Sequence, residues 1–124
     1  MELVRQPRDS NLCGQACVAM LAGISLAECI GWFGTAGATT TKQVIKALHD
    51  LGIPCGEALV RIKQQPKPSV CMVVLHFAGV KCAHWVVYNN GKYYDPAEGI
   101  GDGYIDTVRE TSYLPIAGAE GGAD

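Results

Sequence analysis

The dipeptide Asn90-Gly91 restricts the fold of this chain more than any other feature of its sequence. It separates two runs rich in strand-forming residues, His84 to Asn89 and Lys92 to Asp95. Asparagine followed by glycine readily adopts the positive φ angles of a two-residue type I′ turn, so we predict a β-hairpin here. Such a short turn also fixes the register of the two strands, in which Val86 is expected to face Asp95.

This register brings His84 and Asp95 to the same face of the hairpin. His84 shares a face with Val86 because side chains alternate along a strand, and Asp95 lies opposite Val86. Diagonal neighbours across two strands are roughly 7–8 Å apart, close enough for an imidazole and a carboxylate to form a hydrogen bond. A carboxylate on one ring nitrogen leaves the other free to accept a proton. The hairpin therefore predicts a general base, His84, with an orienting carboxylate, Asp95.

The first half of the chain has helical patterns. Ser10 and Asn11 are capping residue types placed just before a run of helix formers. Ser25 and Glu28 form a capping-box pattern, and apolar residues repeat with helical spacing further on. We predict helices from Cys13 to Gly23, from Ser25 to about Trp32 and from Lys42 to Asp50.

The second half changes to short runs rich in β-branched residues, separated by turn-forming residues. Helices followed by antiparallel strands predict an α+β fold in which the N-terminal helices pack on the sheet. In addition to the hairpin, we predict strands at Ala58 to Ile62, Val70 to Phe77, Tyr104 to Val108 and Tyr113 to Ile116.

The size and charge of the chain exclude several classes of protein. Its 124 residues fit one domain, which we place at residues 1–117, with a flexible tail of small and polar residues at 118–124. The net charge is -2, and no stripe of Lys or Arg could follow a nucleic-acid backbone. No run approaches the roughly 20 apolar residues that cross a bilayer, and the start lacks a signal segment. We expect a cytoplasmic protein that binds neither nucleic acid nor membrane.

The six cysteines are expected to be free thiols. An even number of cysteines in a short chain can form a disulfide framework, but so apolar a chain has no need of one. Several of the cysteines also lie in apolar runs, where thiols behave as small hydrophobic groups.

Cys13 has the best position for a nucleophile among them, because it falls in the first turn of the first predicted helix. The unpaired N–H groups and the positive end of the dipole at a helix N-terminus stabilise a thiolate. Gly14 has no Cβ, which leaves room for a substrate backbone to bind beside the thiol. Cys17, one turn later, is expected to face the sheet without this stabilisation.

Three segments together resemble a known family. The run from Asn11 to Leu21 (NLCGQACVAML), followed by HWVV at residues 84–87 and YDPAEG at residues 94–99, resembles papain-like cysteine peptidases of the bacteriocin-processing type, which often cleave after double-glycine leaders. The resemblance implies a papain-like fold with Cys13 as nucleophile, His84 as general base and Asp95 as orienting carboxylate. It implies hydrolysis of peptide or isopeptide bonds in a peptide or protein substrate through a thioester, with no metal or other cofactor.

The same resemblance implies that a glutamine shortly before the nucleophile stabilises the oxyanion. Gln6 is the candidate, seven positions before Cys13, which is one more than is expected for the family. Gln15 lies inside the predicted helix and is expected to project elsewhere. The substrate is not fixed by the resemblance, because no transporter domain accompanies this chain.

Alternative functions remain open at this stage. Deamidation, transglutamination and removal of ubiquitin-like modifiers all begin with the same thioester chemistry, and a papain-like fold can also serve only in binding. A metal-binding module would draw its ligands from two pairs, Cys13 with Cys17 and Cys82 with His84, whose spacing is poor for zinc.

The remaining histidines are expected to be structural. His49 falls late in a predicted amphipathic helix, where it can cap carbonyl groups, and His76 lies in an apolar strand without an obvious carboxylate partner.

Overall fold

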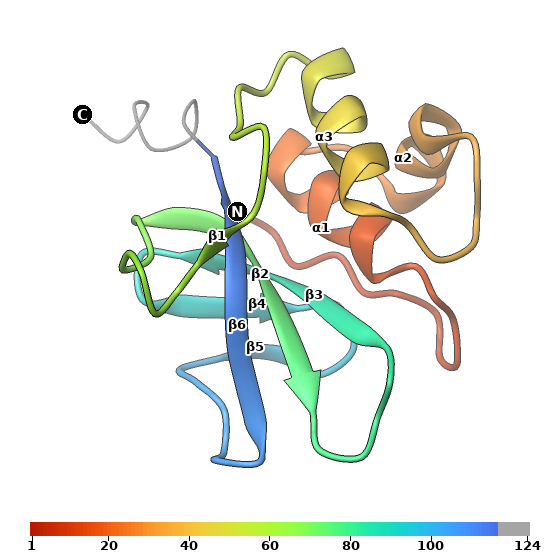
Figure 1. Ribbon diagram of the computed structural model, residues 1–124. Coiled ribbons are helices and arrows are strands. Elements are labelled where there is room, and N and C mark those ends of the chain that lie inside the picture. Colours follow the sequence, from red (N-terminus) through yellow and green to blue (C-terminus); the bar gives the residue numbers. More distant parts are fainter. Residues whose placement is uncertain (117–124) are drawn as a thin grey trace.

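The computed structural model describes residues 1–116, which form three helices and a six-stranded antiparallel sheet (Figure 1). The prediction of an α+β fold with N-terminal helices packed on an antiparallel sheet is confirmed. The predicted tail at 118–124 and residue 117 lie outside the described residues. The helices are α1 (Cys13–Ala22), α2 (Leu26–Phe33) and α3 (Thr41–Asp50). The strands are β1 (Val60–Arg61), β2 (Val70–Phe77), β3 (Ala83–Asn89), β4 (Lys92–Asp95), β5 (Gly99–Gly101) and β6 (Val108–Pro115), in the spatial order β1-β6-β2-β3-β4-β5.

Two apolar clusters lie on opposite faces of the sheet. Strand β2 contributes to both, because alternate side chains of its continuous apolar run point to opposite sides. The helices cover one face, where the larger cluster includes Val18 of α1, Leu48 of α3 and Met72 of β2. The opposite face carries a smaller cluster, whose buried members are Cys71, Val73, Leu75, Val86, Tyr93 and Tyr113.

The predicted hairpin is present between β3 and β4 with the predicted register. Val87 pairs with Tyr94 and Asn89 pairs with Lys92. Asn90 and Gly91 have φ angles of 50° and 92°, so both turn residues adopt the left-handed conformation that this dipeptide tolerates. The local turn chemistry therefore sets the register, as expected from the sequence.

The helix starts differ from the predicted ones in two places. Leu12 is the N-cap of α1 and no side chain caps this helix, so the prediction that Ser10 and Asn11 cap it is wrong, because both precede the capping position. In α2, the Ser25 side chain accepts the Glu28 N–H at 3.1 Å, as expected for that cap. A complete capping box, which the sequence analysis did not identify, starts α3 at Thr40 and Gln43.

The C-terminal strands also differ from the prediction. The predicted strand from Ala58 to Ile62 shortens to β1, and the predicted strand from Tyr104 to Val108 is a loop up to the start of β6. Strand β6 instead extends over eight residues because its backbone pairs with β2. Strand β5 was not predicted, because its two glycines give no strand signal and only backbone pairing with β4 defines it.

Candidate active site

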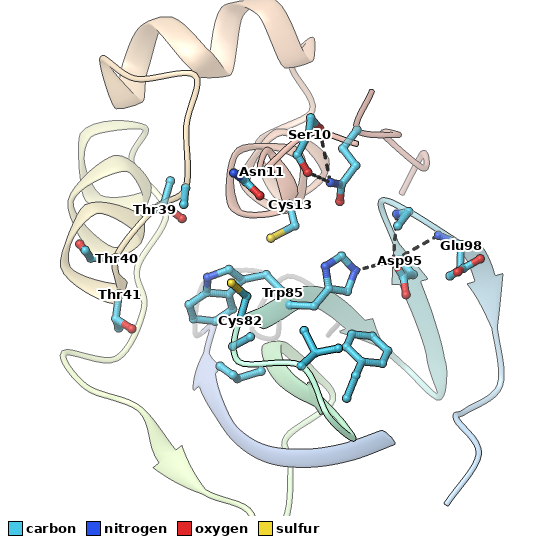
Figure 2. Close-up of a pocket in the computed structure, with 18 of the residues that line it drawn as sticks. Ser10, Asn11, Cys13, Thr39, Thr40, Thr41, Cys82, Trp85, Asp95 and Glu98 are labelled. Atoms are coloured by element: carbon cyan, nitrogen blue, oxygen red, sulfur yellow. Dashed lines mark hydrogen bonds and ion pairs between the residues drawn. The ribbon is translucent and has the colours of Figure 1, made fainter. Parts of the chain in front are cut away.

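A pocket of about 650 Å³ opens where the start of α1 meets the beginning of β3 (Figure 2). Cys13, His84, Asp95 and Gln6 all line it, so four of the five site residues predicted from the sequence border a single cavity. The α2–α3 connection forms one wall. Five apolar residues of β2, β3 and their connection also line the pocket, namely Val74, Phe77, Val80, Ala83 and Trp85.

Cys13 is the first residue of α1, and its sulfur points into the pocket (Figure 2). Because no side chain caps this helix, the first-turn N–H groups remain available to stabilise a thiolate at Cys13. Burial acts to raise the pKa of Cys13. The hydrogen bond and charge of His84, together with the backbone N–H groups of Trp85 and Gly14, outweigh burial and lower the pKa of Cys13 below its ordinary value of 9.0.

His84 connects Cys13 to Asp95. Its Nε2 lies 2.7 Å from Asp95 Oδ1, which leaves Nδ1 free to interact with the Cys13 thiol. Burial acts to lower the pKa of His84, but the interactions with Asp95 and Cys13 and their negative charges raise it from 6.5 to about 9. The raised pKa of His84 and the lowered pKa of Cys13 both favour a thiolate–imidazolium pair.

Asp95 is held by four hydrogen bonds and is only 1% exposed. Its Oδ1 is hydrogen-bonded to His84 Nε2 and accepts hydrogen bonds from the Ala97 N–H at 2.9 Å and the Glu98 N–H at 3.3 Å. Its Oδ2 accepts the Tyr104 hydroxyl at 2.9 Å. Burial acts to raise the pKa of Asp95, but these hydrogen bonds and the charge of His84 lower it below 3.8. The carboxylate therefore stays ionised, with both oxygens fixed in position.

Tyr104 is the residue of this network that the sequence analysis missed. It lies in the loop between β5 and β6, where a strand had been predicted, and no motif marks it. Its ring packs edge-on against Tyr93, which directs the hydroxyl to Asp95. Tyr104 does not line the pocket, so it contacts the site only through Asp95.

For an acyl-transfer reaction at Cys13, Tyr104→Phe is expected to lower kcat by roughly tenfold with little change in KM, because a hydrogen bond to a charged group contributes about 1.5–3 kcal/mol. Steady-state kinetics on a substrate of that reaction measures both constants. Tyr88→Phe is the matched control, since Tyr88 also packs against Tyr93 but has no hydrogen bond to Asp95. An equal loss of kcat in both variants would contradict this role for Tyr104.

Gln6 lines the pocket, but its side-chain amide is engaged within the chain. Gln6 Nε2 donates to the Ser10 carbonyl oxygen at 2.9 Å and lies 3.4 Å from Ser10 Oγ, as the dashed lines at Ser10 in Figure 2 show. Gln6 Oε1 is buried without a hydrogen-bond partner among residues 1–116. Gln6 is therefore close to the thiol, and its role toward an oxyanion stays a prediction.

Gly14 and Gln15 position the α2–α3 connection against the pocket. A Cβ at Gly14 would collide with the Thr39 side chain, so the space beside Gly14 is occupied by this connection. The contact of Gly14 with a substrate stays a prediction. Gln15 is fully buried and points away from the thiol, as expected, and its Nε2 donates to the carbonyl oxygens of Thr35 at 3.0 Å and Gly37 at 2.9 Å. These contacts hold the wall that contains Thr39.

Cys17, His49 and His76 lie outside this arrangement. Cys17 is fully buried in the core, and burial raises its pKa well above 9.0. His49 Nε2 lies 3.7 Å from Glu57 Oε1 on the surface, and His76 lies in β2, where it pairs with Ala83 of β3. The six cysteines all lie among residues 1–116, and none of them forms a disulfide, as expected. Within residues 1–116, no three His, Cys, Asp or Glu side chains form a group that could hold a metal ion.

Among the described residues, no single helix is long and apolar enough to cross a bilayer, although α1 and α2, bent by 111°, reach that length and composition together. No protein-family model matches the chain, and no curated protein matches it either.

Proposed function

We propose that this chain is a papain-like cysteine peptidase that hydrolyses peptide or isopeptide bonds. The observation that supports the proposal most strongly is that Cys13, His84 and Asp95 line one pocket, where His84 is hydrogen-bonded to Asp95 and lowers the pKa of Cys13. A thiol, an imidazole and a carboxylate linked in this order are the elements of nucleophilic acyl transfer. The order of the three residues in the chain and the motifs around them support the likeness to papain-like enzymes.

In the proposed reaction, the Cys13 thiolate attacks a peptide carbonyl carbon and forms a tetrahedral intermediate. The backbone N–H of Cys13 and the Gln6 side chain stabilise its oxyanion, which requires Gln6 Nε2 to turn from Ser10 toward the pocket. The His84 imidazolium then protonates the leaving amine, and the C–N bond breaks to give a thioester. Water, deprotonated by His84, finally attacks the thioester and releases the acid and the thiol.

Asp95 acts in this scheme through His84. Its fixed Oδ1 holds the ring so that Nδ1 faces the sulfur, and its charge stabilises the imidazolium. The two N–H groups and the Tyr104 hydroxyl prevent the carboxylate from turning away. These contacts would preserve the geometry during each proton transfer.

Incubation of the purified protein with a diverse peptide library tests the proposal, because cleavage products identify hydrolysis and its sequence preference. We expect a bell-shaped dependence of kcat/KM on pH. The acid limb arises where the Cys13 thiolate is protonated, at a pH below 9.0 because its pKa is lowered. The alkaline limb lies near pH 9, where the His84 imidazolium loses the proton that the leaving amine requires.

The products also separate the related thiol chemistries. Conversion of glutamine side chains to glutamate without chain cleavage would indicate a deamidase, and amine incorporation would indicate a transglutaminase. If Cys13 reacts with iodoacetamide at neutral pH no faster than the other thiols and no peptide changes, the proposal is wrong and a binding role replaces it.

A further inference from the structure

The pocket contains a second thiol that the proposed reaction does not use. Cys82 lies directly before β3, is exposed, and lines the same pocket as Cys13. Figure 2 shows both sulfurs directed into this pocket, that of Cys13 from the start of α1 and that of Cys82 from the β2–β3 connection. Cys82 is also only two residues before His84, which raises the reactivity of Cys13 by lowering its pKa.

The connection that carries Cys82 is exposed along its length. Residues 78–82, which join β2 to β3, are all exposed, whereas most of β2 is buried. The Ala78 N–H anchors the start of the connection, because it donates to the Thr107 carbonyl oxygen at 3.2 Å. Pairing between β2 and β3 begins only at His76 and Ala83, so the residues around Cys82 can shift without breaking a pair between these strands. A disulfide requires Cα atoms about 4.4–6.8 Å apart, and this connection is the segment that can move to meet that requirement.

The remaining thiols are not placed to form a disulfide with Cys13. Cys17, Cys29 and Cys71 are fully buried in the two apolar clusters. Cys55 is partly buried at the isolated bridge to Ile116 and does not line the pocket. Cys82 is thus the one exposed thiol of the six, and the only one besides Cys13 that borders the cavity.

We propose that Cys82 is a resolving cysteine, which forms a reversible disulfide with Cys13 after hydroperoxides have oxidised Cys13. The Cys13 thiolate attacks the O–O bond of hydrogen peroxide, which gives a sulfenic acid and hydroxide. The Cys82 thiolate then attacks the Cys13 sulfur, the S–O bond breaks, and hydroxide leaves. In total, two thiols and one peroxide give one disulfide and two water molecules, and a dithiol reductant restores both thiols.

This disulfide would protect the nucleophile and block the pocket at the same time. A sulfenic acid without a neighbouring thiol proceeds in excess peroxide to sulfinic acid, which dithiothreitol does not reduce. The proposal requires a reactive Cys13 but does not require that Cys13 hydrolyses peptides. Peptide cleavage before oxidation therefore reports on the proposed function, and disulfide formation reports on this inference alone.

The test treats the purified full-length protein with hydrogen peroxide and measures its mass and the iodoacetamide labelling of Cys13 before and after dithiothreitol. We expect the oxidised protein to be about 2 Da lighter and its Cys13 labelling to return fully on reduction. Trypsin should release residues 9–42 joined to residues 82–92, and this cross-linked peptide should be absent from Cys13→Ser.

The Cys82→Ser variant should lose this protection. Each variant is compared with its own untreated sample, and Cys82→Ser should gain about 32 Da as a sulfinic acid and fail to recover its labelling. Cys55→Ser is the matched control and should recover like the unchanged protein. Equal recovery of Cys82→Ser, a disulfide-linked dimer in place of the internal bond, or resistance of Cys13 to peroxide would each overturn the inference.

Discussion

Replacement of Cys13 by alanine is expected to reduce turnover by a factor on the order of 10⁶, below the detection limit of a peptide-cleavage assay. Cys17, one turn further along α1, cannot take its place, because it is fully buried and its pKa is raised. The variant should fold normally, since Cys13 is only partly buried at the end of a helix and its removal leaves the core intact.

Cys17→Ala is the matched control for this experiment. It removes a thiol from the same helix but from the apolar core, so it should lower the melting temperature and retain turnover. Circular dichroism confirms that both variants are folded at the assay temperature. Full activity in Cys13→Ala, or loss of activity in a folded Cys17→Ala, would show that the nucleophile has been assigned to the wrong residue.

The second large effect is expected for Asp95→Asn, which should lower kcat by roughly 10- to 10⁴-fold. The amide oxygen can still accept from His84, and the amide nitrogen can donate to the Tyr104 hydroxyl, so the network keeps its shape. The negative charge is lost, however, and the pKa of His84 should fall from about 9 toward 6.5. The thiolate–imidazolium pair then loses its main stabilising charge.

The pH profile distinguishes this loss of charge from a general loss of structure. The alkaline limb of kcat/KM should move to lower pH in Asp95→Asn, because the imidazolium loses its proton earlier. Asp102→Asn removes a carboxylate that is exposed and paired with Lys92, and it should leave both limbs in place. An unchanged alkaline limb in Asp95→Asn would mean that Asp95 does not set the charge state of His84.

The pairing of His84 with Asp95 could be predicted because it depends on local chemistry. The turn at Asn90-Gly91 requires φ angles that few other dipeptides adopt, and a two-residue turn permits only one register. The position of Cys13 at the start of a helix could also be predicted from the local sequence, but the residue that caps this helix could not. Ser10 and Asn11 fall before the capping position, and the backbone and hydroxyl of Ser10 receive the Gln6 amide instead.

The parts that could not be predicted depend on contacts between distant segments. Tyr104 reaches Asp95 from a loop, and its apolar neighbours give the same pattern as a short strand. Thr39 fills the space beside Gly14 only because Gln15 binds the backbone of the α2–α3 connection. The spacing of residues in the sequence does not indicate such contacts. The pocket wall at Thr39 and the hydrogen bond of Tyr104 to Asp95 are therefore seen only in the three-dimensional structure.

The sulfur and the imidazole belong to different layers of the molecule, one at a helix end and the other on the sheet. Gly14 of the helical layer makes only the smallest of the contributions that lower the pKa of Cys13, and the larger ones come from the sheet, where His84 supplies the charge and Trp85 an N–H donor. The reactivity of this single thiol therefore reports whether the helical layer is packed on the sheet. If the helical layer separates from the sheet under heat or denaturant, Cys13 reverts to an ordinary thiol, even while secondary structure persists.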